Sequence, residues 1–361
     1  MIRSTNFFKS STFFILPLQF IRRSFSAVGL LLPLLLFFSC KTTSDLQYST
    51  IYRGHSIEGL SARALAVITD AVIVAGPGGV FCGRFFGGDL VEQPAIKDAE
   101  DIRDIHLFNN GTMVLMNSGE HGTIYHIGFN GEQTKVFDSA GVFLDGMDFW
   151  DDQNGICYGD PVNGKFFLLR TFDSGLTWFN LTPPTLPVIL KNEAGFAASG
   201  TGIQCIGDST VYFVTGMADT ARMFCSYDRG ETWTVKNTSI KSGGSYGIYS
   251  TYFWSENEGI IIGGSWEEID YKKKICYYTS DGGNSWENRS KGLGGYTSCV
   301  QGNKDATFLA ATGDKGTYFS LDKGETWNLL FDRNFYSLSV DKDYLVLIGR
   351  DGVLEVYLYK L

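Results

Sequence analysis

The chain has 361 residues, of which 44% are hydrophobic, 15% aromatic and 19% charged, and this low charge with high aromatic content excludes an intrinsically disordered chain. Its 43 Gly against 8 Pro are typical of a protein with many turns and exclude a collagen-like or proline-rich polymer. The formal net charge of −9 excludes nucleic acid as a partner, because affinity for nucleic acid comes mostly from neutralising phosphates.

The first 40 residues are predicted to be a signal peptide of the bacterial lipoprotein type. Two arginines precede an apolar run at 27–38, which is too short to span a bilayer comfortably and has the length of a signal-peptide core. The run ends at Ser39-Cys40, which resembles a lipobox, and the resemblance implies that Cys40 carries a lipid anchor to the membrane. We therefore expect an exported lipoprotein in the periplasm, on the outer membrane or at the cell surface. The alternative is an ordinary secretory signal, and the Phe-rich start leaves the true start codon open.

Beyond residue 40 the chain is predicted to be all-β. Runs rich in β-branched and aromatic residues are bounded by Gly, Asp or Asn, as is typical of strands between turns. Examples are the runs at 166–170, 210–214, 259–263 and 307–311. No stretch shows a sustained helical apolar period.

One eight-residue motif, which we call the box, occurs four times. The copies read TFDSGLTW at 171–178, SYDRGETW at 226–233, TSDGGNSW at 279–286 and SLDKGETW at 320–327. The shared pattern is [ST]-x-D-x-G-x-[ST]-W. An Asp can accept backbone N–H groups to close a turn, a Gly permits positive φ, and a Trp buries a large ring. The box residues expected to be structural are Asp173, Gly175, Trp178, Asp228, Gly230, Trp233, Asp281, Gly283, Trp286, Asp322, Gly324 and Trp327.

Repeats of about 40–55 residues with about four strands each indicate a β-propeller. We predict seven blades, at 54–95, 101–140, 143–190, 195–241, 246–291, 295–332 and 335–361. The last unit has room for only three strands, and the segment 47–52 is expected to supply the missing outer strand and so hide the open edge of the ring. The predicted organisation is a signal peptide at 1–40, a short tether and closing strand at 41–53 and the propeller at 54–361.

The box resembles the Asp-box (BNR) repeat of bacterial neuraminidases, sortilin-type receptors and reelin. The segments DGMDFWDDQNGICYGDP at 145–161 and GFAASGT at 195–201 resemble exported bacterial relatives of the photosystem II stability/assembly factor family. Such relatives are often labelled oxidoreductase or BNR-repeat glycosyl hydrolase. The resemblance covers residues 54–361 and implies a seven-bladed propeller outside the cytoplasm, but no particular reaction.

The alternative to a binding protein is a glycoside hydrolase that acts on a polysaccharide. Such an enzyme needs two carboxylates about 5–10 Å apart in an aromatic-lined cleft, and the candidates are Asp145, Asp148 and Asp160. A sialidase is disfavoured because arginines are sparse and the Arg-Ile-Pro motif of that family is absent. A nucleotide-dependent oxidoreductase is disfavoured because no G-x-G-x-x-G motif precedes a helix. We therefore expect no cofactor.

The favoured interpretation is a protein-binding or assembly scaffold, because a propeller is a rigid disc that presents loops on two faces. Its binding residues, expected near the central channel or on one face, are Arg63, Arg103, Asp145, Asp148, Ser199, Thr201 and Tyr249. The loops at 182–187, 241–246 and 267–274 are expected to be docking edges.

Cysteine and histidine residues give no metal motif. The cysteines after the signal are Cys82, Cys157, Cys205, Cys225, Cys276 and Cys299. Their even number in an exported protein allows disulfides, whereas their position in apolar runs favours buried thiols. The four histidines lack zinc-ligand spacing, so no metal is expected.

Overall fold

The computed structural model describes residues 46–54, 60–68, 71–77, 79–84, 91–92 and 101–361. They belong to one compact unit, which begins at Cys40. The predicted signal peptide and its lipidation residue Cys40 lie outside the described residues. Within the described ranges, no helix has the length and apolar character to cross a bilayer.

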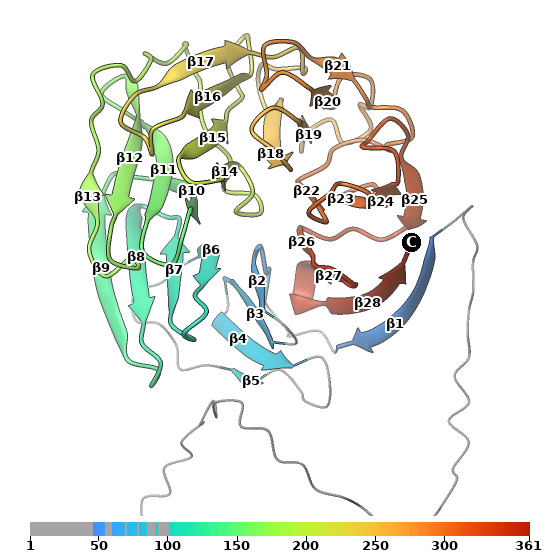
Figure 1. The fold of residues 1–361 in the computed structure, drawn as a ribbon, viewed down its shortest axis with the longest axis horizontal. Coiled ribbons are helices and arrows are strands. Elements are labelled where there is room, and N and C mark those ends of the chain that lie inside the picture. Colours follow the sequence, from blue (N-terminus) through green and yellow to red (C-terminus); the bar gives the residue numbers. More distant parts are fainter. Residues whose placement is uncertain (1–45, 55–59, 69–70, 78, 85–90, 93–100) are drawn as a thin grey trace, which may run out of the picture. The chain divides into compact units, whose positions relative to one another are not determined.

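The described residues form seven antiparallel four-stranded sheets, as predicted (Figure 1). Blade 1 holds β2 (Ala64–Ile68), β3 (Ala71–Gly76), β4 (Gly79–Arg84) and β5 (Val91–Glu92). Blade 2 holds β6 (Ile102–Leu107), β7 (Met113–Asn117), β8 (His121–Ile127) and β9 (Gln133–Ala140). Blade 3 holds β10 (Leu144–Phe149), β11 (Gly155–Val162), β12 (Lys165–Thr171) and β13 (Phe179–Asn180).

Blades 4 to 6 repeat this order. Blade 4 holds β14 (Ile203–Ile206), β15 (Thr210–Val214), β16 (Arg222–Ser226) and β17 (Thr234–Asn237). Blade 5 holds β18 (Gly247–Phe253), β19 (Gly259–Gly264), β20 (Cys276–Thr279) and β21 (Glu287–Asn288). Blade 6 holds β22 (Cys299–Gly302), β23 (Leu309–Gly313), β24 (Gly316–Ser320) and β25 (Asn328–Phe331).

Blade 7 joins the two ends of the described chain. It holds β26 (Ser337–Val340), β27 (Tyr344–Ile348) and β28 (Leu354–Lys360), with the 3₁₀ turn η1 (Arg350–Gly352) between the last two. Its fourth strand is β1 (Gln47–Arg53), which pairs antiparallel with β28. The closing strand predicted from the sequence is therefore present. It covers the outer edge of β28, which would otherwise be open to pairing.

The first strands of the blades form the inner ring. Each contacts the first strand of the next blade, in the order β2, β6, β10, β14, β18, β22 and β26, and β26 contacts β2. The ring of blades is therefore closed, and the fold is the predicted seven-bladed β-propeller.

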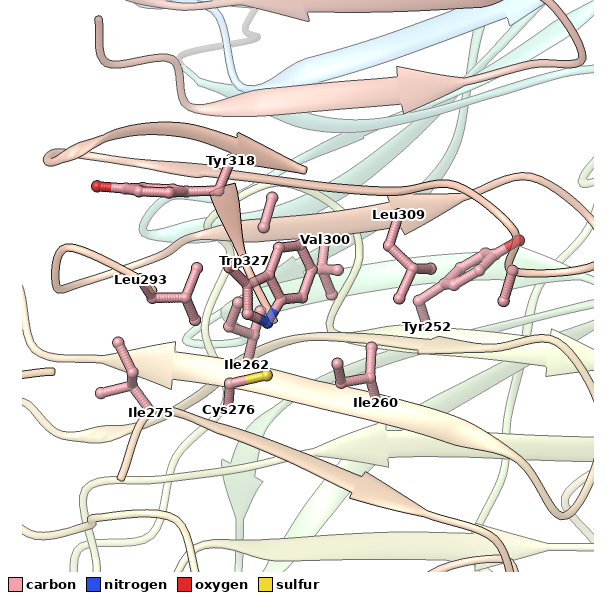
Figure 2. Close-up of a cluster of buried hydrophobic side chains, with 12 residues drawn as sticks. Tyr252, Ile260, Ile262, Ile275, Cys276, Leu293, Val300, Leu309, Tyr318 and Trp327 are labelled. Atoms are coloured by element: carbon pink, nitrogen blue, oxygen red, sulfur yellow. The ribbon is translucent and has the colours of Figure 1, made fainter. Parts of the chain in front are cut away.

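The hydrophobic core lies between neighbouring blades. Figure 2 shows one such layer, in which the Trp327 ring from a box in blade 6 packs among Ile260, Ile262 and Cys276 of blade 5. These side chains are 4% exposed or less. A fully buried Ile contributes roughly 1.5–3 kcal/mol to folding, so seven such layers hold the ring together without a large single core.

Polar latches join the inner strands. The carboxylate of Asp104 in blade 2 accepts the N–H of Met147 in blade 3, at 2.8 Å. The carboxylate of Asp148 in blade 3 accepts the N–H of Cys205 in blade 4, at 2.7 Å. The Gln204 amide pairs with both backbone groups of Phe253 in blade 5. These contacts satisfy backbone groups that the sheets leave unpaired.

Candidate functional site

The antiparallel order gives the propeller two faces. The front face, as we name it, carries the loops that join the second strand to the third and those that join each blade to the next. The opposite, back face carries the loops from first to second and from third to fourth strands. All four boxes join third to fourth strands and therefore lie on the back face.

Each box forms the same turn. In the box at 279–286, Asp281 Oδ1 accepts the Ser285 N–H at 2.8 Å, and Oδ2 accepts the Ser285 hydroxyl at 2.7 Å. The Gly283 N–H donates to Thr279 Oγ1, and Gly283 has φ +86°. The hydrogen bond from the Ser285 hydroxyl lowers the pKa of Asp281 to about 2. The four box aspartates are thus occupied by their own turns, one in each of blades 3 to 6.

A cavity of about 690 Å³, which we call the acidic cavity, opens on the front face between loops of blades 3, 4 and 5. It is lined by Asp160, Pro161, Ile189, Asn192, Glu193, Ala194, Met217, Gly244, Ser245, Trp266 and Glu267. Two of the loops expected to be docking edges, 241–246 and 267–274, contribute residues to the lining of the acidic cavity. The third, 182–187, does not.

A smaller cavity of about 190 Å³, which we call the arginine cavity, adjoins it through Trp266. It is lined by Arg63, Arg103, Phe196, Ala197, Ala198, Tyr249, Trp266 and Tyr296. Three of the predicted binding residues, Arg63, Arg103 and Tyr249, are therefore brought together here from blades 1, 2 and 5.

The arginine cavity combines stacked rings with two cations. Phe196 stacks on Tyr249 with ring centres 3.9 Å apart, and Trp266 meets the Tyr249 ring edge-on at 6.0 Å. The Arg63 guanidinium lies 4.3 Å from the centre of the Tyr336 ring. Burial and then the charge of Arg103 lower the pKa of Arg63. Arg103 already donates to the Asp101 carboxylate, and a further carboxylate bound here would favour the charged form of Arg63.

A recurring β-bulge places three of the predicted residues. The register between the first and second strands shifts at Arg103 in blade 2, at Asp145 in blade 3 and at Tyr249 in blade 5. Such bulges re-aim side chains beside functional sites. Arg103 and Tyr249 line the arginine cavity, whereas Asp145 lines neither cavity.

The predicted hydrolase carboxylates are only partly brought together. Asp145 is 1% exposed, and neither of its carboxylate oxygens has a hydrogen-bond partner among the described residues. Asp160 is half-buried, lines the acidic cavity and accepts the Gly195 N–H at 3.0 Å. A Cβ on Gly195 would lie 2.3 Å from Asp145 Oδ2, so both carboxyls lie against this glycine. Asp148 lines neither cavity, because its carboxylate forms the latch to blade 4.

Burial raises the pKa of all three carboxyl groups. It raises the pKa of Asp148 to about 6. It raises the pKa of Asp145 well above its ordinary value, and the neighbouring Asp160 raises it further. It also raises the pKa of Asp160. Burial therefore penalises the ionised form of Asp145 in the folded protein.

Residues 196–201 cross the interior of the ring. The Ser199 hydroxyl donates to Ser298 O in blade 6 at 2.9 Å, and the Thr201 carbonyl accepts the Thr251 N–H of blade 5 at 2.9 Å. On the other side, Arg103 of blade 2 donates to Ala197 O at 2.7 Å. Neither Ser199 nor Thr201 lines a cavity, and their hydroxyls are bonded to one another and to protein groups. The first strand of blade 4 consequently begins at Ile203, later than the predicted blade start at 195.

Sequence reasoning missed Trp266, Glu193 and Phe196. Trp266 is 46% exposed and forms part of both cavities. A tryptophan outside the box pattern, directly after an apolar strand, is a signal that could have identified it. Glu193 gives no such signal, because its partner Arg222 is 29 residues away in the chain.

No cysteine is among the described residues that line the two cavities. Among the described residues, Cys157, Cys225, Cys276 and Cys299 are buried and Cys205 is half-buried, all without a disulfide. In the same part of the chain no group of three or more His, Cys, Asp or Glu side chains could hold a metal ion.

Comparisons with known proteins support the fold alone. No family model and no curated protein matches the chain. Among solved structures, YCF48 bound to D1 peptide is similar with a TM-score of 0.59 and 13% identity, over 88% of this chain and 98% of that one. A catalytically inactive virginiamycin B lyase from Staphylococcus aureus with quinupristin is similar with a TM-score of 0.60 and 10% identity, over 87% and 98%. The chain therefore shares a propeller fold with a peptide-bound protein and with an enzyme.

Proposed function

We propose that this protein is an exported, lipid-anchored scaffold that binds a protein segment on the front face of its propeller. The observation that carries the proposal is the pair of adjoining cavities, which share Trp266 and bring together two arginines, one stacked aromatic pair and an acidic wall. Exposed aromatics and arginines are the residues that dominate protein interfaces. A peptide-bound propeller among the similar structures supports the same use of the fold. The four boxes, each with the same turn, support the assignment of this propeller to the Asp-box type as part of the proposal.

Capture of partners from membranes tests this function. The full chain is expressed in its native host, crosslinked and purified, and the captured proteins are compared between the wild type and Trp266→Ala. We expect Trp266→Ala to lose the wild-type partner. Phe129→Ala, which removes an aromatic residue 52% exposed on the back face, should retain it. Equal capture by both variants contradicts binding at the front face.

The lipid anchor is tested separately. Cys40→Ser should release the protein from the membrane fraction, because the modified thiol supplies the anchor. A variant that remains in the membrane fraction contradicts this part of the proposal.

A glycoside hydrolase is the second candidate, favoured only by the proximity of Asp145 and Asp160 at Gly195. The burial of Asp145 counts against it, because a substrate in the acidic cavity cannot touch that carboxyl. Turnover of a polysaccharide panel by the wild type, lost in Asp160→Asn, would establish this alternative.

A further inference from the structure

The acidic cavity has an uncompensated negative charge. Glu193 is neutralised, because Arg222 Nε donates to its Oε1 at 2.8 Å and a second guanidinium nitrogen contacts its other oxygen. Asp160 and Glu267 have no cationic partner among the residues that the structure describes. Asp160 accepts only the Gly195 N–H, and Glu267 accepts the Ser245 hydroxyl at 2.7 Å. None of the residues that line the cavity is a Lys, Arg or His.

A third carboxyl lies behind the wall. Asp145 contacts Gly195, whose chain neighbour Ala194 and hydrogen-bond partner Asp160 both line the cavity. Both oxygens of Asp145 are without a hydrogen-bond partner among the described residues. A positive charge placed in the cavity would meet the carboxylates of Asp160 and Glu267 on the wall, and it would favour the ionised form of the buried Asp145 beneath them. Low local polarity strengthens such attraction.

Two exposed apolar residues, which we call the rim, are chain neighbours of a residue that lines the cavity. Val188 is 66% exposed and Leu190 is 36% exposed, and they flank Ile189, which lines the wall. Trp266 presents a half-exposed ring at the junction with the arginine cavity, and such rings attract cations. The site thus combines a negative interior with an apolar rim, which fits a long aliphatic side chain that ends in a cation.

We propose that the acidic cavity binds a lysine or arginine side chain of the partner segment, with apolar neighbours of that residue on the rim. This inference rests on the proposed function and assigns a chemical class to one part of the bound segment. The aliphatic stem would pack against Ile189 and Met217, and the cation would lie between Asp160 and Glu267.

The test uses the full chain purified in detergent and a random heptapeptide library displayed on phage. We expect the wild type to enrich peptides in which a lysine or arginine is flanked by apolar residues. The double variant Asp160→Asn/Glu267→Gln keeps oxygen acceptors for Gly195 and Ser245 but removes both charges, so it should lose this enrichment. Asp219→Asn removes one exposed carboxylate from the same face outside the cavity and should keep it.

A selected peptide is then synthesised in two forms, one with its basic residue and one with norleucine at that position. We expect the norleucine peptide to bind about tenfold more weakly in calorimetry, since a charged hydrogen bond contributes on this scale. The difference should shrink at high salt, because exposed charges are screened. Equal affinity of the two peptides, or an unchanged basic preference in the double variant, overturns the inference.

Failure of the inference is distinguishable from failure of the proposed function. If the selected peptides show no preference for a basic residue, but bind the wild type and not Trp266→Ala, then the cation site alone is overturned. A wild-type chain that enriches no peptide above the bare support would overturn both.

Discussion

Single carboxyl groups in this propeller take very different roles according to their surroundings. Asp281 accepts hydrogen bonds within an exposed turn, and these keep it ionised. The Asp148 carboxylate accepts a backbone N–H of the next blade, whereas Asp145 is buried without a hydrogen-bond partner among the described residues. Burial penalises the charged form and raises the pKa of Asp145, whereas hydrogen bonds to the carboxylate lower the pKa of Asp281.

Asp145 makes the stability of the propeller depend on pH. Its raised pKa means that the folded state retains a proton that the unfolded state loses above the ordinary value of 3.8. Its contribution to stability is therefore full below that value and is lost as pH rises through the pKa of the folded state. Asp145→Asn does not titrate, so the free energy of unfolding of the variant relative to the wild type should increase with pH. Urea denaturation at a series of pH values measures this difference, and parallel curves contradict it.

At the scale of elements, the box is a repeated turn that connects the outer two strands of a blade. Its glycine has positive φ in all four copies, at +77°, +90°, +86° and +82°. Its tryptophan is most deeply buried in the second and fourth copies, at 3% and 4% exposed. Local hydrogen bonds and packing against the neighbouring blade thus act together in one short segment.

Removal of a box carboxylate should weaken its blade. Asp281→Ala deletes the acceptor for Ser285 and Thr279, so we expect a lower midpoint of thermal unfolding at neutral pH. Because the pKa of Asp281 is lowered to about 2, its ionised form stabilises the fold above the ordinary value of 3.8. This stabilisation is lost as pH falls through about 2, and the deficit of the variant should shrink accordingly. Glu325→Ala, at a variable box position, is the control. Calorimetry that finds equal deficits for both variants contradicts the prediction.

At the scale of the whole molecule, stability depends on closure of the ring. Strand β1 comes from the start of the described chain and completes the blade formed by its end. Its half-buried side chains reach both neighbouring layers: Tyr48 packs against the layer between blades 6 and 7, and Ile51 against the layer between blades 7 and 1. The ring of blades is closed, because each first strand contacts the first strands of both neighbouring blades.

A chain that begins at residue 54 lacks β1 and should be less stable than one that begins at residue 46. We expect a loss of about 3 kcal/mol in the free energy of unfolding, because the shorter chain loses the buried Leu46 as well as the half-buried Tyr48 and Ile51. The exposed edge of β28 should also promote aggregation. Denaturant titration and light scattering measure both effects. Equal stability of the two chains would show that closure by β1 is dispensable.

The sequence by itself determined the all-β fold, the seven blades, the box turns and the closing strand. These features depend on residues close together in the chain or on a pattern that repeats, so their signals are local. The binding role of Arg63, Arg103 and Tyr249 remains a prediction, although their position at one cavity agrees with it.

Only the tertiary structure decided which side chains meet. The segment at 196–201 crosses the ring because it bonds to blades far away in sequence, and the acidic cavity exists because loops of three blades converge. The burial of Asp145 and the latch of Asp148 also depend on the next blade, whose position no local pattern encodes. Side-chain environment in a closed ring is set by packing between repeats, whereas strand and turn formation is set within each repeat.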